Sequence, residues 1–227
     1  VCDGWSAQVL AHDLGAAYSA RRRGEAPAWS GPVRRRAGEP TPAEAARSEE
    51  YWTTMLRGAP HRTELPTDRP RPSTASFAGF SRHRRVAGGL AQRLADLAAQ
   101  HGVTPFTVLH AALTTALHRL GAGDDIVLGT PVAGRDADDA DVVDMFVNTL
   151  VLRTQITAAT PFDEVLSRSR AAVHGALQHQ DISFERVVEL VRPPRSSSTH
   201  PIFQVLLSLD DTPRRAVRME GLDVRPA

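Results

Sequence analysis

Apolar residues recur every three to four positions over six stretches of the chain, which is the spacing of one face of an α-helix. The predicted helices are residues 6–21, 42–56, 90–98, 105–120, 161–177 and 184–191. Three other stretches are continuously apolar over strand length, as covered strands are, at residues 124–132, 146–153 and 202–209. Residues 76–86 are predicted to form a fourth strand with an arginine-rich polar face. Because strands and helices alternate, we predict an α/β fold with a mixed sheet and helices packed on it.

Local residue chemistry marks where these elements start and stop. Ser6 is the expected N-cap of the first helix, and Thr41 with Glu44 fits a capping box at the start of the second. Two stretches rich in proline and glycine, residues 25–40 and 60–72, lack any periodicity and are predicted to be linkers. The second of them is the predicted boundary between two lobes.

The composition is that of an ordinary globular protein. Of the 227 residues, 41% are hydrophobic and 23% charged, and no apolar run approaches the length of a membrane span. All 27 basic residues are arginine, yet the net charge is only +1, so no overall field directs the chain to nucleic acid or to a membrane. A single cysteine, Cys2, excludes an internal disulfide and favours a reducing, cytoplasmic location.

Common catalytic and metal-binding motifs are absent from the sequence. It contains no P-loop, no dinucleotide-binding fingerprint and no CxxC pair. The nine histidines show no HExxH or HxH spacing, so no metal site is predicted. His110 and His118 lie eight residues apart in a predicted helix, and we expect both to be ordinary packed side chains with satisfied hydrogen bonds.

Four short segments combine polar residues in ways that packing alone does not require. An acidic residue and a glycine precede the first helix, an Asn and a Thr interrupt an apolar strand, a polar cluster joins two helices, and a serine-rich loop leads into an apolar run. Taken singly, each has a structural explanation as a cap, a buried polar group, a turn or a flexible loop. The segments are residues 3–6 (DGWS), 146–149 (FVNT), 179–185 (HQDISFE) and 195–202 (RSSSTHPI).

The order and spacing of these segments resemble the condensation domains of nonribosomal peptide synthetases. DGWS is similar to the end of the family's His-His-xxx-Asp-Gly motif, and DMFVNTLVLRT to its GxFVNT strand. HQDISFE resembles the HQDxPFE segment, with Ser183 where proline is usual. RSSSTHPIFQV resembles the RDxSRxPLFQV loop, with Ser196 and Thr199 as departures. DDIVLGTPVAGR, residues 124–135, also matches the family's style, so the resemblance extends over essentially the whole chain.

The resemblance implies a two-lobed fold like that of chloramphenicol acetyltransferase, built around a tunnel. Residues 1–60 would be the end of the N-terminal lobe with its linker, and residues 70–227 most of the C-terminal lobe. The implied reaction is amide formation between a donor thioester and an acceptor aminoacyl thioester. The implied partners are donor and acceptor peptidyl carrier proteins and adjacent synthetase domains. No cofactor would bind directly, because the phosphopantetheine arm belongs to the carrier proteins.

The resemblance also assigns roles to individual residues. Asp3 and Gly4 would belong to the catalytic motif, with Asp3 paired to an arginine outside this chain and Gly4 leaving room for close approach. The motif's second histidine would lie two residues before Val1, so we expect the 227-residue chain not to condense substrates by itself. The implied substrate-binding residues, which would line or brace the tunnel, are Trp5, Ser6, Asn148, Gln180, Asp181 and Arg195.

Three alternatives stay open at this point. The same fold could serve an epimerisation domain or a stand-alone acyltransferase, although FVNT with HQD favours condensation. It could be a non-catalytic platform that binds a tailoring enzyme, against which the intact Asp3-Gly4 pair argues. It could also be an α/β domain of another role. The arginine runs 21–23 and 34–36 suit docking of an acidic carrier protein, but a solvated linker explains them more simply.

Overall fold

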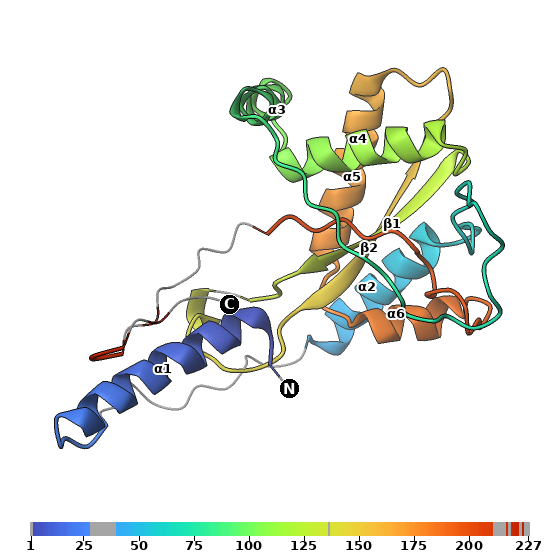
Figure 1. The fold of residues 1–227 in the computed structure, drawn as a ribbon. Helices are drawn as coiled ribbons and strands as arrows, with labels where there is room; N and C mark the ends of the chain where they lie inside the picture. The colour runs from blue at the N-terminus through green and yellow to red at the C-terminus, as the bar shows by residue number, and fades with distance from the viewer. Residues whose placement is uncertain are drawn as a thin grey trace. The chain divides into compact units, whose positions relative to one another are not determined.

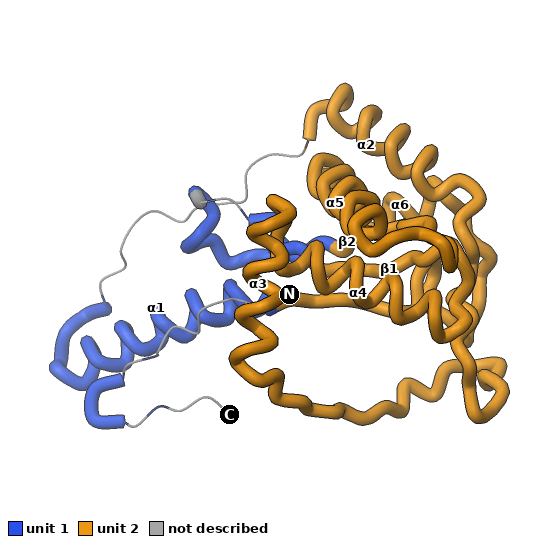
Figure 2. Tube along the Cα trace, turned by 90° about the horizontal axis from the view of Figure 1, so that it is seen from above, with its two compact units in different colours: residues 1–39, 132–148, 210–227 blue, residues 40–131, 149–209 orange. Residues whose placement is uncertain are grey.

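The computed structural model describes residues 2–27, 40–135, 137–210, 217, 219–222 and 224. The chain divides into two compact units (Figure 2): residues 1–39, 132–148 and 210–227 form unit 1, and residues 40–131 and 149–209 form unit 2. The units are interleaved along the sequence, so their boundaries differ from the predicted lobe boundary, and the assignment of residues 1–60 and 70–227 to two lobes stays a prediction. Most of the predicted 25–40 linker, with the arginine run 34–36, lies outside the described residues.

Unit 1 is built on helix α1 (Gly4–Arg22) and on the loop before the second strand, which includes the 3-10 helix η1 (Ala137–Asp139). The N-cap of α1 is Asp3, whose side chain accepts a hydrogen bond from the backbone N–H of Ser6. The prediction that Ser6 caps this helix is therefore wrong, and the helix begins two residues earlier. Aspartate at this position satisfies one of the free N–H groups of the first turn.

The sheet consists of strands β1 (Asp125–Val132) and β2 (Asn148–Gln155). The backbone N–H of Ile156, just after β2, bonds the carbonyl of Asp124, just before β1, at 2.8 Å, so the two strands run antiparallel. Their central residues are buried, which confirms the prediction of covered strands.

The predicted third strand at residues 202–209 is wrong in its extent. Among the residues that the structure describes, that segment makes only an isolated parallel bridge to β1, in which Gly129 bonds the backbones of Val205 and Leu207 at 2.9 Å each. Ile202, in the left-handed region at φ 68°, turns the chain just before the bridge. The sheet is thus one antiparallel pair, and the parallel contact within the described ranges is limited to this single bridge, whereas the sequence predicts a mixed sheet.

Five helices belong to unit 2, and each corresponds to a predicted one. Helix α4 packs against α3 and α5, and α2 packs against α6 (Figure 1). The core between α3, α4 and α5 is formed by small and branched apolar residues together with Ile156. Thr41 and Glu44 form the predicted capping box of α2. The bounds are α2 Pro42–Met55, α3 Gly88–Gln100, α4 Pro105–Arg119, α5 Phe162–Gln178 and α6 Phe184–Val191.

The prediction of a strand at residues 76–86 is wrong. The segment has no regular structure, and all of its side chains are exposed, with Phe77 96% and Phe80 84% accessible. No neighbouring strand pairs with it among the described residues, and a strand is stable only when its backbone groups find such a partner.

His110 departs from expectation in a different way. It is fully buried on α4, as an ordinary core residue would be, but neither ring nitrogen has a hydrogen-bond partner among the described residues. Burial alone lowers the pKa of His110 to about 4, so the imidazole is neutral at pH 7. His118 is satisfied, because its Nδ1 lies 2.9 Å from the carbonyl of Gly123.

No helix within the described ranges is long and apolar enough to cross a membrane. The same part of the chain holds no group of three or more His, Cys, Asp or Glu side chains arranged to bind a metal ion.

Candidate active-site scaffold around Asp3

The carboxylate of Asp3 is at the centre of a hydrogen-bond network within unit 1. One oxygen, Oδ1, accepts from the backbone N–H of Ser6 at 2.8 Å, and Oδ2 accepts from the backbone N–H of Phe146 at 3.1 Å. The backbone N–H of Asp3 donates to the carbonyl of Asp144 at 3.3 Å. Since the side chain is only 2% exposed, it is a buried anion that needs such donors.

Arg135 supplies the opposite charge. Its Nη2 lies 3.1 and 3.2 Å from the two carboxylate oxygens of Asp3, and its Nη1 donates to the carbonyls of Asp139 at 2.5 Å and Val142 at 2.7 Å. The guanidinium carbon lies 3.9 Å from the ring centre of Phe146, a cation–π contact. The expectation that Asp3 pairs with an arginine outside this chain is therefore wrong, because the partner ends the 124–135 segment.

Ser6 and Trp5 attach the start of α1 to the same loop. The Ser6 hydroxyl donates to the carbonyl of Asp144 at 2.8 Å and accepts from the Asp144 N–H at 3.1 Å and from Arg135 at 2.9 Å. The Trp5 indole N–H donates to the carbonyl of Ala140 at 2.8 Å. Ser6 is fully buried, so the structure gives it an anchoring role. Substrate contact by Trp5 and Ser6 stays a prediction.

The electrostatics of Asp3 suit a fixed charge. Burial raises the pKa of its carboxyl, but the hydrogen bonds from Ser6, Phe146 and Arg135 together outweigh burial and hold the pKa below its ordinary value. The group is therefore ionised at neutral pH and is not matched to proton transfer there. The arrangement holds Arg135 and residues 139–146 against the start of α1.

Gly4 and Asn148 are the remaining predicted site residues of unit 1. Gly4 is exposed, and a Cβ atom added to it would meet nothing within 4 Å. That open space agrees with the predicted close approach of another molecule, which stays untested. Asn148 is the first residue of β2 and is partly buried.

Gln180 and Asp181 belong to unit 2, in the turn between α5 and α6. Asp181 accepts a hydrogen bond from the hydroxyl of Ser48 at 2.6 Å, and Ser48 also lies 3.0 Å from Nδ1 of His179. Gln180, between these two anchored residues, is exposed. The turn is thus attached to helix α2 through residues on both sides of Gln180.

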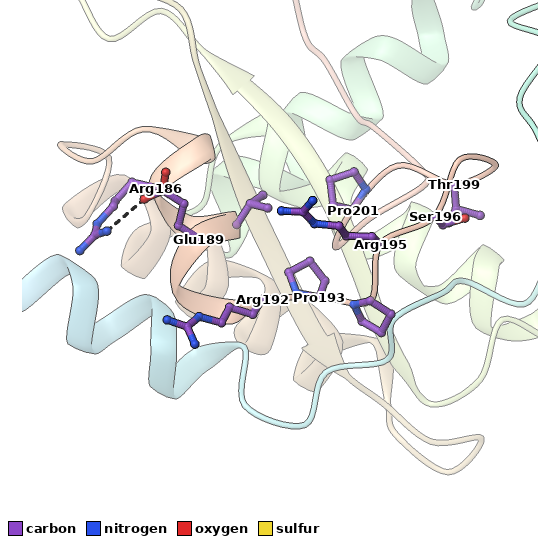
Figure 3. Close-up of a pocket in the computed structure, with 10 residues that line it drawn as sticks. Arg186, Glu189, Arg192, Pro193, Arg195, Ser196, Thr199 and Pro201 are labelled. Carbon is purple, nitrogen blue, oxygen red and sulfur yellow. Dashed lines mark hydrogen bonds and ion pairs between the residues drawn. The ribbon is translucent and has the colours of Figure 1, made fainter.

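Arg195 lines a pocket of about 890 Å³ in unit 2, at the end of α6 and the loop after it (Figure 3). Arg186, in the same lining, is paired with Glu189 at 3.0 Å and with Glu49 at 2.8 Å. Arg192 and Arg195 are exposed, and neither forms an ion pair with any residue that the structure describes. Two uncompensated guanidinium groups can bind a phosphate or a carboxylate.

Three residues of these networks were not predicted as site residues: Arg135, Ser48 and His179. Arg135 ends a recognisable sequence segment, and a buried acid at Asp3 requires a cation, so that pairing was open to inference. Nothing in the sequence marks Ser48 as a site residue, because serine is common within helices. Its role depends on the packing of α2 against the 179–181 turn. His179 lies in the HQDISFE segment, but its role depends on contacts that only the fold supplies.

Comparisons with known proteins point to one family. The sequence profile of the condensation domain matches residues 1–224. The chain is 44% identical over 98% of its length to a Salinispora arenicola protein described as a probable nonribosomal peptide synthetase, CymA. It is 39% identical over 98% of its length to the dimodular nonribosomal peptide synthase of Bacillus subtilis. The chain spans only 3% and 10% of these two relatives.

Solved structures agree with this result. The X-domain from teicoplanin biosynthesis superimposes with a TM-score of 0.80 at 32% identity, covering 90% of this chain and 48% of that one. An X-domain from the same biosynthesis has also been solved in complex with OxyB. The chain therefore corresponds to about half the length of those domains.

Proposed function

The chain belongs to the condensation-domain family of nonribosomal peptide synthetases, and from this premise we propose that it is part of a domain that joins two carrier-bound thioesters through an amide bond. The acceptor amine attacks the carbonyl carbon of the donor thioester. A C–N bond forms and the C–S bond breaks. The amine gives up one proton, and the sulfur of the donor carrier's arm leaves as a thiolate that takes up one proton to become a thiol.

One observation carries this proposal: the buried Asp3–Arg135 pair that attaches the start of α1 to the loop preceding β2. Amide formation from two tethered substrates depends on how well the amine is placed against the thioester carbonyl. A carboxylate fixed by the N–H groups of Ser6 and Phe146 and by a buried guanidinium cannot move without breaking several bonds at once. Asp3 is thus suited to hold the neighbouring segment in place, while proton transfer needs a group with a pKa nearer neutrality.

The substrates in this proposal are carried on phosphopantetheine arms of peptidyl carrier proteins, and the neighbours are other synthetase domains. The uncompensated Arg192 and Arg195 at the pocket after α6 support an anionic partner such as an acidic carrier protein.

The test uses a synthetase module that contains this sequence, with both carrier proteins loaded, and measures amide product by mass spectrometry. Asp3→Asn and Arg135→Met each remove one member of the pair, and we expect about a 100-fold slower rate, the size of effect that small misplacements produce. Asp96→Asn, at an exposed position of α3, is the matched control and should leave the rate unchanged. Wild-type rates in both pair variants would contradict the proposal.

A second function, a non-catalytic platform, is favoured by the similarity to the teicoplanin X-domain at a TM-score of 0.80. The chain would then hold a tailoring enzyme beside the synthetase, as that X-domain binds OxyB. A wild-type module that retains a tailoring enzyme on size-exclusion chromatography and forms no amide would support the platform. Amide formation by the same module would exclude it.

A further inference from the structure

Helix α2 presents three side chains to the turn between α5 and α6. Ser48, Tyr51 and Trp52 lie at spacings of three and four residues, so they share one face of the helix. The Trp52 indole N–H donates to the carbonyl of His179 at 2.9 Å, and the Tyr51 ring stacks on the imidazole with centroids 4.2 Å apart and planes 19° apart. Both the backbone and the ring plane of His179 are therefore fixed from α2.

The hydroxyl of Ser48 determines which ring nitrogen of His179 carries the proton. A serine hydroxyl has one hydrogen, and a carboxylate can only accept. The 2.6 Å contact with Asp181 therefore uses the Ser48 hydrogen, which leaves the serine oxygen only as an acceptor toward His179. At 3.0 Å from that oxygen, Nδ1 must be the donor. Hydrogen bonds thus run from His179 Nδ1–H to Ser48 and from Ser48 to Asp181.

A neutral imidazole protonated at Nδ1 has its lone pair on Nε2. Within the described residues, Nε2 of His179 makes no hydrogen bond, and it is not one of the buried polar atoms that lack a partner. His179 is partly buried, and because its Nε2 makes no hydrogen bond to a described residue yet is not a buried atom without a partner, this nitrogen keeps some exposure to solvent. The ring is thus held in one tautomer and one orientation, with an unused acceptor at Nε2. A ring nitrogen oriented by a third group in this way is a recurring arrangement in acid–base sites.

We propose that Asp181, Ser48 and His179 form a positioning relay that presents His179 Nε2 as a hydrogen-bond acceptor for an amine or amide N–H of the thioester substrates. This inference rests on the proposed condensation function for the identity of its ligand. The imidazole of His179 is then one polar contact that this turn offers to a substrate. Asp181 acts through Ser48, and its carboxylate is already engaged.

The tautomer is tested directly on the 227-residue chain, by 15N NMR of its histidine side chains at neutral pH. We expect His179 to be protonated at Nδ1 and unprotonated at Nε2. Ser48→Ala removes the acceptor and Asp181→Ala frees the Ser48 hydrogen for Nδ1, so both variants should shift the proton to Nε2. Ser48→Thr should keep the wild-type tautomer, and Thr54→Ala, at an exposed position of the same helix, is the control. A wild-type ring protonated at Nε2, or tautomers unchanged in both Ala variants, would overturn the relay.

The acceptor role is tested in the loaded module by His179→Asn and His179→Gln. Asparagine can retain the N–H toward Ser48 but has no group at the place of Nε2, and we expect about a tenfold lower kcat/KM for amide formation with an unchanged melting temperature. Glutamine, whose longer side chain can reach that place, should retain more of the activity. Wild-type kcat/KM in His179→Asn would overturn this role. An inactive wild-type module whose His179 shows the predicted tautomer would instead contradict the proposed condensation function. Failure of the relay and failure of the condensation function can therefore be distinguished.

Discussion

Replacing Arg135 by methionine is the sharpest test of the scaffold. The substitution keeps much of the side-chain volume but removes the guanidinium, which is 5% exposed and contacts both oxygens of Asp3. It also removes the donors to the carbonyls of Asp139 and Val142. What remains is a buried carboxylate that keeps only the two backbone N–H groups and the Ser6 hydroxyl nearby.

The expected size of the effect follows from that burial. Removing one member of a buried ion pair costs about 3–5 kcal/mol, because the other charge stays desolvated. Folded domains have a free energy of unfolding of about 5–15 kcal/mol, so this is a large share of it. For a chain of this size each kcal/mol lowers the melting temperature by about 2–4 °C, which predicts a decrease of about 6–20 °C.

Circular dichroism during thermal and urea unfolding measures the change, with Arg170→Met at an exposed position of α5 as the control. A double-mutant cycle with Asp3→Asn separates the pair from general damage. Because asparagine removes the stranded charge, Arg135→Met should cost at least about 1.5 kcal/mol less in that background than in the wild type. Additive effects, or a loss below 1 kcal/mol in the single variant, would refute the reasoning.

Three further predictions concern unit 2. Burial lowers the pKa of His110 to about 4, so between pH 6.5 and 4 its imidazole is protonated in the unfolded chain and neutral in the folded chain. The free energy of unfolding should therefore fall by about 1.4 kcal/mol for each unit by which the pH is lowered through this range. His110→Leu should remove this contribution in pH-dependent urea titrations, and an unchanged pH slope would contradict it. Arg153 binds Asp125 at 2.6 Å and donates to two backbone carbonyls at the end of α2, so Arg153→Met should lower the free energy of unfolding by about 1–3 kcal/mol in urea titrations. An unchanged free energy of unfolding would show that these contacts do not stabilise the fold. A Cβ atom on Gly129 would overlap the ring of Phe203, so Gly129→Ala should lower the free energy of unfolding by about 1–3 kcal/mol. Phe203→Leu in that background should recover part of the loss, and equal melting temperatures for Gly129→Ala and wild type would contradict the contact.

Local chemistry allowed much of the fold to be predicted. The capping box of Thr41 and Glu44 determines the start of α2, and the N-cap Thr104 determines the start of α4. Each cap bonds a residue only three positions away, so these helix starts can be predicted from the sequence alone. The apolar runs of β1 and β2 are likewise confirmed, because continuous burial leaves a continuous apolar pattern. The predicted N-cap of α1, Ser6, is wrong, because aspartate and serine both suit an N-cap and only the fold shows that the helix uses Asp3.

Long-range pairing accounts for the errors. Whether residues 76–86 or 202–209 form strands depends on a neighbouring strand far away in the sequence, and no local pattern reports one. In the same way, the arginine that pairs with Asp3 is Arg135, which lies 132 residues away in the sequence. The contact between Ser48 and His179 is also long-range, since the two residues lie 131 positions apart, and a serine within a helix does not predict it.

The irregular stretch that follows α2 has a consequence for how the chain can be divided. It is attached to the rest of unit 2 by hydrogen bonds of Thr63, Ser73 and Ala75. The residues that follow, 76–87, are all exposed to solvent. That open run contains Arg82, Arg84 and Arg85, so trypsin should cut here before it reaches any helix. Helix α2 would remain bound to the other fragment through Ser48 and through the Arg153 contacts at its end. The gene could accordingly be split at this point and its two products allowed to reassemble.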